Sequence, residues 1–243
     1  MRVSRIGLAV LKGARHAAQT SVRLEQGGPV GDRLFCLVDP TEGRVLRTVE
    51  HPRLVLVEAG WDGTALTTTT PEGGVVAAAP RPTGEQLAFE YWGREARVEL
   101  QDSPHAEQLG DHLGRSVRLA RVTRPGEVVY AGSVSLVSTG EIAELGETDP
   151  ARFRATFTLD SARLPEPGTQ LAVGEALIRV RSMLPRCRVI DINTGTGTMD
   201  TRHLATLAGR PRPVGELPFG LDAEVLVPGT VHTGDPVSAT TGP

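Results

Sequence analysis

The residues best suited to chemistry gather in residues 181–200, R-S-M-L-P-R-C-R-V-I-D-I-N-T-G-T-G-T-M-D. Cys187 lies between Arg186 and Arg188. Two neighbouring cations favour the thiolate, the form of cysteine that attacks electrophiles and binds soft metals. The polar, glycine-rich loop that starts at Asn193 offers backbone N–H groups to an anion. The same pattern also fits a small apolar residue in a strand, followed by an ordinary turn.

Other candidate residues are more isolated. The six histidines are scattered without a metal-ligand spacing, and we expect His105 and His112 on the surface of a helix. Cys36, the second of two cysteines, is expected in the core. Tyr130 either lines a pocket or packs in the core with one hydrogen bond. The sequence lacks the fingerprints of P-loop, dinucleotide-binding and serine-hydrolase sites.

Composition narrows the function classes. The 243 residues carry a net charge of −3 and only 4% aromatic residues, which argues against a nucleic-acid-binding protein. The absence of a long apolar segment and of a signal peptide predicts a cytoplasmic protein that does not span a membrane. Lys12 is the single lysine of the chain, and every other residue counted among Lys and Arg is an arginine.

The elements that must position these residues are predicted to be mostly short strands. Short apolar segments between turn residues predict a barrel or a sandwich. The predicted strands are residues 2–10, 34–39, 53–59, 96–100 and 222–227, with a hairpin over residues 63–80.

Three short helices are predicted from their capping residues. Ser103 is expected to cap a helix over residues 105–114. Ser138 and Glu141 form a capping box for residues 138–145. Asp200 is expected to cap residues 201–208.

Five sequence segments, taken in order, resemble one known family. The last two are L-P-R-C-R-V-I-D-I-N-T-G-T-G and F-G-L-D-A-E-V-L-V-P-G-T-V-H-T-G-D-P-V; the first three are A-V-L-K-G, G-D-R-L-F-C-L-V-D and A-R-F-R-A-T-F-T-L. Together they resemble the MOSC family, named after the C-terminal domain of molybdenum-cofactor sulfurase, with its N-terminal β-barrel domain. The arrangement is similar to that of bacterial relatives of the mitochondrial amidoxime-reducing component.

The resemblance implies roles for individual residues. Cys187 would be the protein ligand to molybdenum, and also the catalytic residue. Basic and polar side chains would hold the pterin and its phosphate, because charge-assisted bonds suit a phosphate. The implied cofactor-binding residues are Lys12, Arg33, Arg154, Thr156, Arg186 and Asn193. Asp32 would orient Arg33.

Three positions depart from the family pattern. Thr156 stands where the family has asparagine, and Gly13 stands where the reductases often have serine. Asn193 replaces an acidic residue of the amidoxime reductases. These changes bear on the substrate and on how the cofactor is held, so a family member without molybdenum stays an alternative.

The resemblance implies a β-rich α+β fold. An N-terminal β-barrel-like domain, residues 1–118, would precede a MOSC β-barrel with a few short helices, residues 119–243, and the cofactor would lie between them. The implied function is a molybdenum-cofactor (Mo-molybdopterin) oxidoreductase that removes oxygen from an N-hydroxylated or N-oxide small-molecule substrate, with electrons from separate donor proteins. The alternatives are a cofactor carrier and a sulfur-relay protein that uses Cys187. The family is also associated with pyridoxal phosphate binding.

Overall fold

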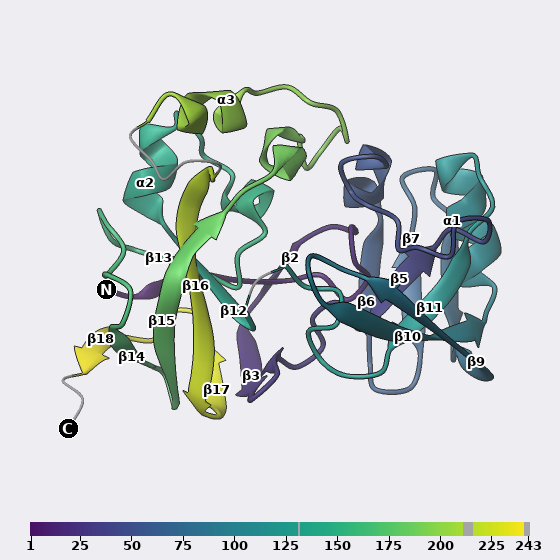
Figure 1. Cartoon of the computed structure of the whole chain (residues 1–243), viewed down its shortest axis with the longest axis horizontal. Helices are drawn as coiled ribbons and strands as arrows, with labels where there is room; N and C mark the ends of the chain where they lie inside the picture. Colours follow the sequence, from purple (N-terminus) through teal and green to yellow (C-terminus); the bar gives the residue numbers. More distant parts are fainter. Residues whose placement is uncertain (131, 211–215, 241–243) are drawn as a thin grey trace.

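The computed structural model describes residues 1–130, 132–210 and 216–240. Its strands are grouped in two lobes that lie side by side (Figure 1). The fold is β-rich α+β, as the sequence predicts, with three α-helices in the described residues. None of the helices in these ranges has the length and apolar character to cross a membrane.

The elements follow one another along the chain in a mostly β order. The strands are β1 (Val3–Leu8), β2 (Ala17–Gln19), β3 (Ser21–Glu25), β4 (Gly28–Pro29), β5 (Phe35–Val38), β6 (Glu58–Trp61), β7 (Leu66–Thr69), β8 (Val75–Ala78), β9 (Arg81–Glu90), β10 (Glu95–Asp102), β11 (Arg118–Val122), β12 (Val134–Ser138), β13 (Phe157–Leu159), β14 (Gln170–Val173), β15 (Ala176–Pro185), β16 (Pro218–Val227), β17 (Gly229–His232) and β18 (Val237–Thr240). The helices are α1 (His105–Leu113), α2 (Thr139–Glu144) and α3 (His203–Ala208), with 3₁₀ helices η1 (Pro52–Leu56), η2 (Pro150–Phe153) and η3 (Arg188–Asp191).

The larger sheet occupies the lobe with α2 and α3 (Figure 1). Its strand order is β18-β14-β15-β16-β12-β13-β1-β2. Most neighbours are antiparallel, and β12 with β13 is a parallel pair. A continuous apolar core lies against this sheet and includes Ile6, Leu136, Phe157, Ile178 and Leu221.

The other lobe contains two smaller sheets and α1. One sheet has the order β5-β11-β10-β9, and the other has the order β6-β7-β8. Phe35, Leu54 and Leu109 lie in the core between these elements. The hairpin predicted over residues 63–80 is present as the antiparallel pair of β7 and β8.

The N-terminal strands join the sheets of the C-terminal lobe. β1 pairs with β13, and β3 pairs with β17. The chain enters the other lobe only afterwards, at β5. The predicted division into domains at residues 118 and 119 stays a prediction, but the pairing shows that the two lobes are tied together by the first thirty residues.

The prediction of a strand over residues 53–59 is wrong for its first part. Residues Pro52–Leu56 form the 3₁₀ helix η1, and β6 begins at Glu58. Leu54 and Val55 are both buried, although they are adjacent. A half-buried strand would send them to opposite faces, whereas Pro52 at the first helical position favours a helical turn.

Two of the predicted helix caps are wrong. The hydroxyl of Ser103 contacts Nδ1 of His105 at 2.6 Å and makes no capping bond to the backbone of α1. Asp200 does not cap α3 either, because its carboxylate is bound by Arg152. The backbone N–H of Leu204 donates instead to the carboxylate of Asp191, which comes from a separate segment.

The histidines of α1 are also placed differently from the prediction. His105 and His112 are both buried and not on the surface. Nε2 of His105 contacts the carbonyl oxygen of Leu66 at 2.8 Å, and Nδ1 of His112 contacts the carboxylate of Glu72. A buried histidine is tolerated where its ring nitrogens have partners, as they do here.

The capping box of α2 is confirmed. The N–H of Glu141 donates to the Ser138 hydroxyl at 3.1 Å, and this hydroxyl donates to the Glu141 carboxylate at 2.8 Å. Ser138 is fully buried, while Thr139 beside it is exposed. We therefore expect Ser138→Ala to lower the free energy of unfolding by about 1 kcal/mol, measured by urea denaturation.

The neighbouring hydroxyl provides the control for this prediction. The Thr139 hydroxyl makes only a long bond, 3.4 Å, to the carbonyl oxygen of Ser161. Thr139→Ala should leave the free energy of unfolding nearly unchanged. Equal losses in the two variants would contradict the capping role of Ser138.

Candidate functional site

A cavity of about 1000 Å³ lies at the junction of the two lobes. Its size is at the upper end of the range for small-molecule and cofactor sites. Both lobes and the segment that connects them contribute to its walls. The predicted site residues that line it are Lys12, Arg33, Arg154, Thr156, Arg186 and Cys187.

Cys187 is a free, exposed thiol on the wall of this cavity. It follows β15 and immediately precedes η3, so its backbone is extended where the strand gives way to a turn. The two flanking arginines point in different directions. Arg186 lines the cavity, whereas Arg188 donates to the sulfur of Met199 at 3.0 Å and is not among the lining residues.

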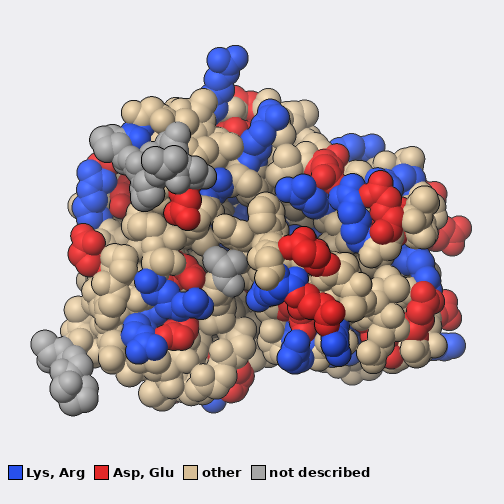
Figure 2. Space-filling model, in the orientation of Figure 1, with Lys and Arg blue, Asp and Glu red and all other residues tan. Residues whose placement is uncertain are grey.

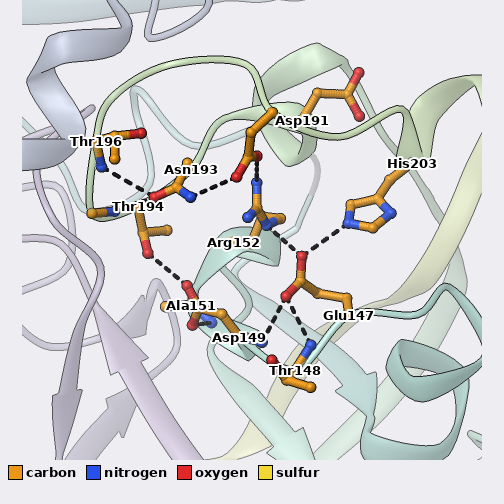
Figure 3. A network of polar contacts seen from close by, with 12 residues as sticks. Glu147, Thr148, Asp149, Ala151, Arg152, Asp191, Asn193, Thr194, Thr196 and His203 are labelled. Carbon is orange, nitrogen blue, oxygen red and sulfur yellow. Dashed lines mark hydrogen bonds and ion pairs between the residues drawn. The ribbon is translucent and has the colours of Figure 1, made fainter.

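The segment after Cys187 is held by a buried network of charged groups (Figure 3). Arg152 forms an ion pair with Glu147 at 2.6 Å and donates to Asp200 at 2.8 Å. His203 of α3 contacts the same Glu147 carboxylate at 2.9 Å. This network fastens η2, η3 and α3 to one another, so the position of Cys187 does not depend on β15 alone.

Two arginines place unpaired donors in the interior. Arg186 donates from Nε to the carbonyl oxygen of Phe219 at 2.6 Å and from Nη1 to that of Phe153 at 2.8 Å. Its Nη2 and the Nη2 of Arg154 are buried, and neither has a hydrogen-bond partner in the protein. Leaving buried donors unsatisfied is unfavourable, and an anionic ligand would satisfy them.

Burial and mutual repulsion act on these guanidinium groups. Burial lowers the pKa of Arg154 to about 9, and the charge of Arg33 adds to this effect. Burial likewise lowers the pKa of Arg186 to about 10, whereas the thiolate of Cys187 opposes the shift. Both pKa shifts show that burial makes the charged form of these guanidinium groups less favourable. A bound anion would stabilise the charged form again.

Arg33 and Lys12 approach the cavity from the N-terminal part of the chain. Arg33 pairs with the carboxylate of Asp32, which also accepts the N–H of Ala9 at 2.9 Å. Asp32 therefore orients Arg33, as the sequence predicts. The ammonium group of Lys12 lies 5.4 Å from the centre of the Tyr91 ring.

The departure from the family pattern at Gly13 has a local reason. Its φ is +91°, a conformation that residues with a Cβ rarely adopt. A Cβ would also approach Leu54 to 2.9 Å. The serine that is usual in the reductases would therefore be strained in this turn.

Thr156 lines the cavity, but its hydroxyl is already used within the protein. It accepts the N–H of Ser135 at 3.2 Å, and the Ser135 hydroxyl accepts the N–H of Thr156 at 3.0 Å. The pair joins β12 to the start of β13. The Thr156 hydroxyl thus fixes this part of the wall as a hydrogen-bond acceptor.

Asn193 is not among the residues that line the cavity. Its side-chain oxygen accepts the N–H groups of Gly195 and Thr196, and its amide donates to Asp200 (Figure 3). The loop that follows Cys187 therefore satisfies its own N–H groups. The structure does not bring Asn193 together with the other predicted site residues.

His16 does not line the cavity, but it feels the charge of the cavity arginines, which the sequence pattern did not reveal. It is buried, and its Nδ1 accepts a hydrogen bond from Arg5 at 3.2 Å. Its Nε2 is buried without a partner. Burial, together with the charges of Arg154, Arg33 and two further arginines, lowers the pKa of His16 well below its ordinary value.

Asp222 is a second residue that the sequence pattern did not single out. It lines the cavity, is buried, and accepts the N–H of Gly132 at 2.7 Å. Burial raises the pKa of its carboxyl, and the nearby Arg181 opposes this shift only in part. Nothing in the strand pattern of residues 222–227 distinguishes Asp222 from a surface residue, because its surroundings come from other segments.

Charges of both signs occur on the outer surface and in the cavity, where Asp32, Glu50 and Asp222 line the walls together with the basic residues. On the face shown in Figure 2, acidic and basic side chains are interspersed. No cluster of three or more His, Cys, Asp or Glu residues suited to a metal ion occurs within the described ranges.

Comparison with known families finds two family models that match this chain. The MOSC N-terminal beta barrel domain matches residues 2–107, and the MOSC domain matches residues 128–238. The chain belongs to the MOSC family. MOSC domains are associated with proteins that bind the molybdenum cofactor. No protein of the curated set matches the chain.

Solved structures with similarity to this MOSC protein are distant in sequence. The YuaD protein from Bacillus subtilis has a TM-score of 0.40 and 12% identity over 97% of this chain and 93% of that chain. YiiM from Geobacillus stearothermophilus has a TM-score of 0.35 and 16% identity over 45% of this chain and 54% of that one. A third structure, of a hypothetical protein, has a TM-score of 0.42 and 12% identity, and the match covers 100% of this chain and 69% of that chain.

The position of His16 gives a prediction about stability and pH. Its pKa is low in the folded protein and returns to about 6.5 on unfolding. Below that pH, the unfolded chain takes up a proton that the folded chain does not, so the free energy of unfolding falls as the pH falls. The slope from this group approaches about 1.4 kcal/mol per pH unit.

We expect His16→Gln to reduce this slope between pH 7 and pH 5, measured by urea denaturation at a series of pH values. His232→Gln is the matched control, because His232 is exposed. An unchanged slope in His16→Gln would contradict the neutral, buried state of His16.

Proposed function

We propose that the cavity binds a molybdenum cofactor, with Cys187 as the protein ligand to the metal. We further propose that the protein reduces an N-hydroxylated or N-oxide-type small molecule. The observation that carries this proposal is the position of an exposed thiol in the same cavity as two buried guanidinium groups with unpaired donors.

The anionic part of the cofactor accounts for the basic wall. Arg154 and Arg186 each offer a buried Nη2 without a partner. A phosphate group presents several acceptor oxygens, which suit arginine donors and the point charge of a lysine. Lys12 and Arg33 line the same cavity and would complete the site for the phosphate.

The Cys187 thiol is the group that would bind the metal. A thiolate is a suitable ligand for a soft metal centre, and Arg186 beside Cys187 supplies positive charge on the cavity side. When bound, the cofactor supplies a redox centre that accepts and delivers two electrons. The protein holds that centre in place and limits the access of water from the solvent.

The proposed reaction consumes two electrons and two protons for each N–O bond cleaved, and the oxygen leaves as water. The electrons come from a separate donor protein. Asp222 is the candidate to hold one proton, because it lines the cavity and burial raises the pKa of its carboxyl. A protonated carboxyl there can pass its proton to the departing oxygen.

A carrier of the cofactor, or a sulfur-relay protein that uses Cys187, is the second candidate function. The exposure of the Cys187 thiol favours it, because a relay needs a thiol that another molecule can reach. A carrier would retain the pterin without turnover of N-oxygenated compounds. Supplying a chemical electron donor and following such turnover would separate the two functions.

Cys187→Ser is the first variant to test. In a host that makes the cofactor, we expect the wild-type protein to hold about one molybdenum and one pterin per chain. The variant should lose molybdenum, because a serine hydroxyl is a poor substitute for a thiolate. Elemental analysis and the fluorescence of the oxidised pterin measure the two contents.

Cys36→Ala is the control for this experiment, because Cys36 is buried in the core of the other lobe and does not line the cavity. It should retain both components. Full retention of molybdenum in Cys187→Ser would rule out the ligand role. A wild-type protein with neither component, from a host that loads another molybdoenzyme, would rule out the cofactor itself.

The two arginines that flank Cys187 provide a matched pair. Arg186→Met should reduce the pterin content several-fold, because it removes a buried cation from the cavity, whereas Arg188→Met should not. Lys12→Met should also reduce the pterin content. This variant keeps the hydrogen bonds of Arg186 to the backbone, so its effect does not come from a change in those bonds. The fluorescence of the oxidised pterin measures the pterin content of each variant. Equal pterin contents in all three variants would show that Lys12 and Arg186 do not bind the anion.

A further inference from the structure

Two exposed aromatic side chains meet at the cavity. Trp92 is 52% exposed and Tyr130 is 42% exposed, and no other aromatic residue in the described ranges is among the exposed large hydrophobic residues. Their ring centres are 4.9 Å apart, with 69° between the ring planes. Both residues line the cavity. In a chain with only 4% aromatic residues, this pairing requires an explanation.

The backbone of Trp92 is strained. Its φ is +54°, in a two-residue turn with Gly93 between β9 and β10. Asparagine, aspartate or glycine is favoured in such a position, and a bulky residue is not. Arg33, Trp92 and Arg154 are the non-glycine residues with positive φ in the described part of the chain, and all three line the cavity.

A strained backbone conformation persists only where the surrounding structure holds it in place, and such conformations are concentrated at functional sites. Arg33 and Arg154 belong to the proposed anion site. The aromatic ring of Trp92 cannot hold an anion in that way. Its strained position therefore calls for a different role in the same cavity.

The turn that carries Trp92 is anchored on both sides. The hydroxyl of Tyr91 donates to the carbonyl oxygen of Val128 at 2.9 Å, and Arg94 donates to that of Gly126 at 2.7 Å. The guanidinium carbon of Arg47 lies 5.4 Å from the centre of the Trp92 ring. The ring is thus held in place before any ligand arrives, which lowers the entropic cost of binding.

The aromatic pair shares its cavity with the proposed redox centre. Trp92, Tyr130 and Cys187 all line this one cavity. The two rings therefore border the same space as the thiol.

We propose that Trp92 and Tyr130 form an aromatic platform that selects substrates with a planar, aromatic ring. Because the two ring planes are 69° apart, a flat ring can stack on the face of one of them while its edge meets the other, and a puckered ring fits this corner less well. The chemistry performed on that substrate rests on the proposed function, but the selection of a planar ring does not. Binding can therefore be tested without turnover.

The test uses the full-length protein labelled with ¹⁵N. The chain has two tryptophans, Trp61 and Trp92, so the indole N–H region shows two signals, and Trp92→Phe assigns them. Quinoline N-oxide is the planar probe, and the N-oxide of N-methyldecahydroquinoline is its saturated counterpart. We expect the planar probe to bind about tenfold more tightly and to shift the Trp92 signal, because a tenfold preference lies within the range that stacking on an aromatic side chain provides.

Two variants keep the proposal falsifiable. Trp92→Phe retains a ring and should keep most of the preference for the planar probe. Trp92→Asn removes the ring but suits the left-handed turn, so it should raise the Tm while abolishing the preference. This variant is expected to fold at least as well as the wild type, so loss of binding cannot be attributed to unfolding.

Three outcomes would overturn the proposal: equal affinity for the two probes, a preference that survives in Trp92→Asn, or a shift of the Trp61 signal alone. A fall in the pterin content of Trp92→Asn would also overturn it, because the ring would then belong to the cofactor site. If the protein binds no molybdenum but prefers the planar probe, the platform stands and the proposed reduction fails.

Discussion

The burial of two guanidinium groups beside one thiol is the constraint on which the rest of this structure depends. Arg186 is held by carbonyl oxygens of Phe153 and Phe219, but these leave its Nη2 and that of Arg154 without partners. Charged donors in such a position are unfavourable unless an anion satisfies them. The protein therefore maintains a wall whose unpaired donors an anion would satisfy.

Both lobes are needed to build that wall. The strand pairing of β1 with β13 places the turn that contains Lys12, and the segment of Arg33 after it, beside η2 and the end of β15. The charged network around Arg152 fixes the segment that follows Cys187. A shift of one lobe against the other would separate the thiol from Lys12 and Arg33, whereas Arg186 and Arg154 would stay on its side.

Features that depend on neighbouring residues were predictable from the sequence. The capping box of α2, the glycine-bounded end of α1 and the hairpin of β7 and β8 all follow from residues a few positions apart. The start of α3 was not predictable, because Arg152 binds Asp200 and Asp191 takes over the capping bond. Residues Pro52–Leu56 form η1 rather than a strand, and the adjacent burial of Leu54 and Val55 in this helical turn depends on the core around them, which the local pattern does not show.

For the site, the sequence by itself determined the chemistry available: one thiol between two arginines, a single lysine, and basic residues in the order of the MOSC family. Only the tertiary structure decided which of these groups meet. In the folded chain Arg186 lines the cavity and Arg188 does not, and the Asn193 side chain is bound within its own loop. Trp92 and Asp222 join the cavity wall from distant segments. The reason is physical: residue type fixes what a group can do, whereas burial and contacts between remote strands fix its charge, its partners and its neighbours.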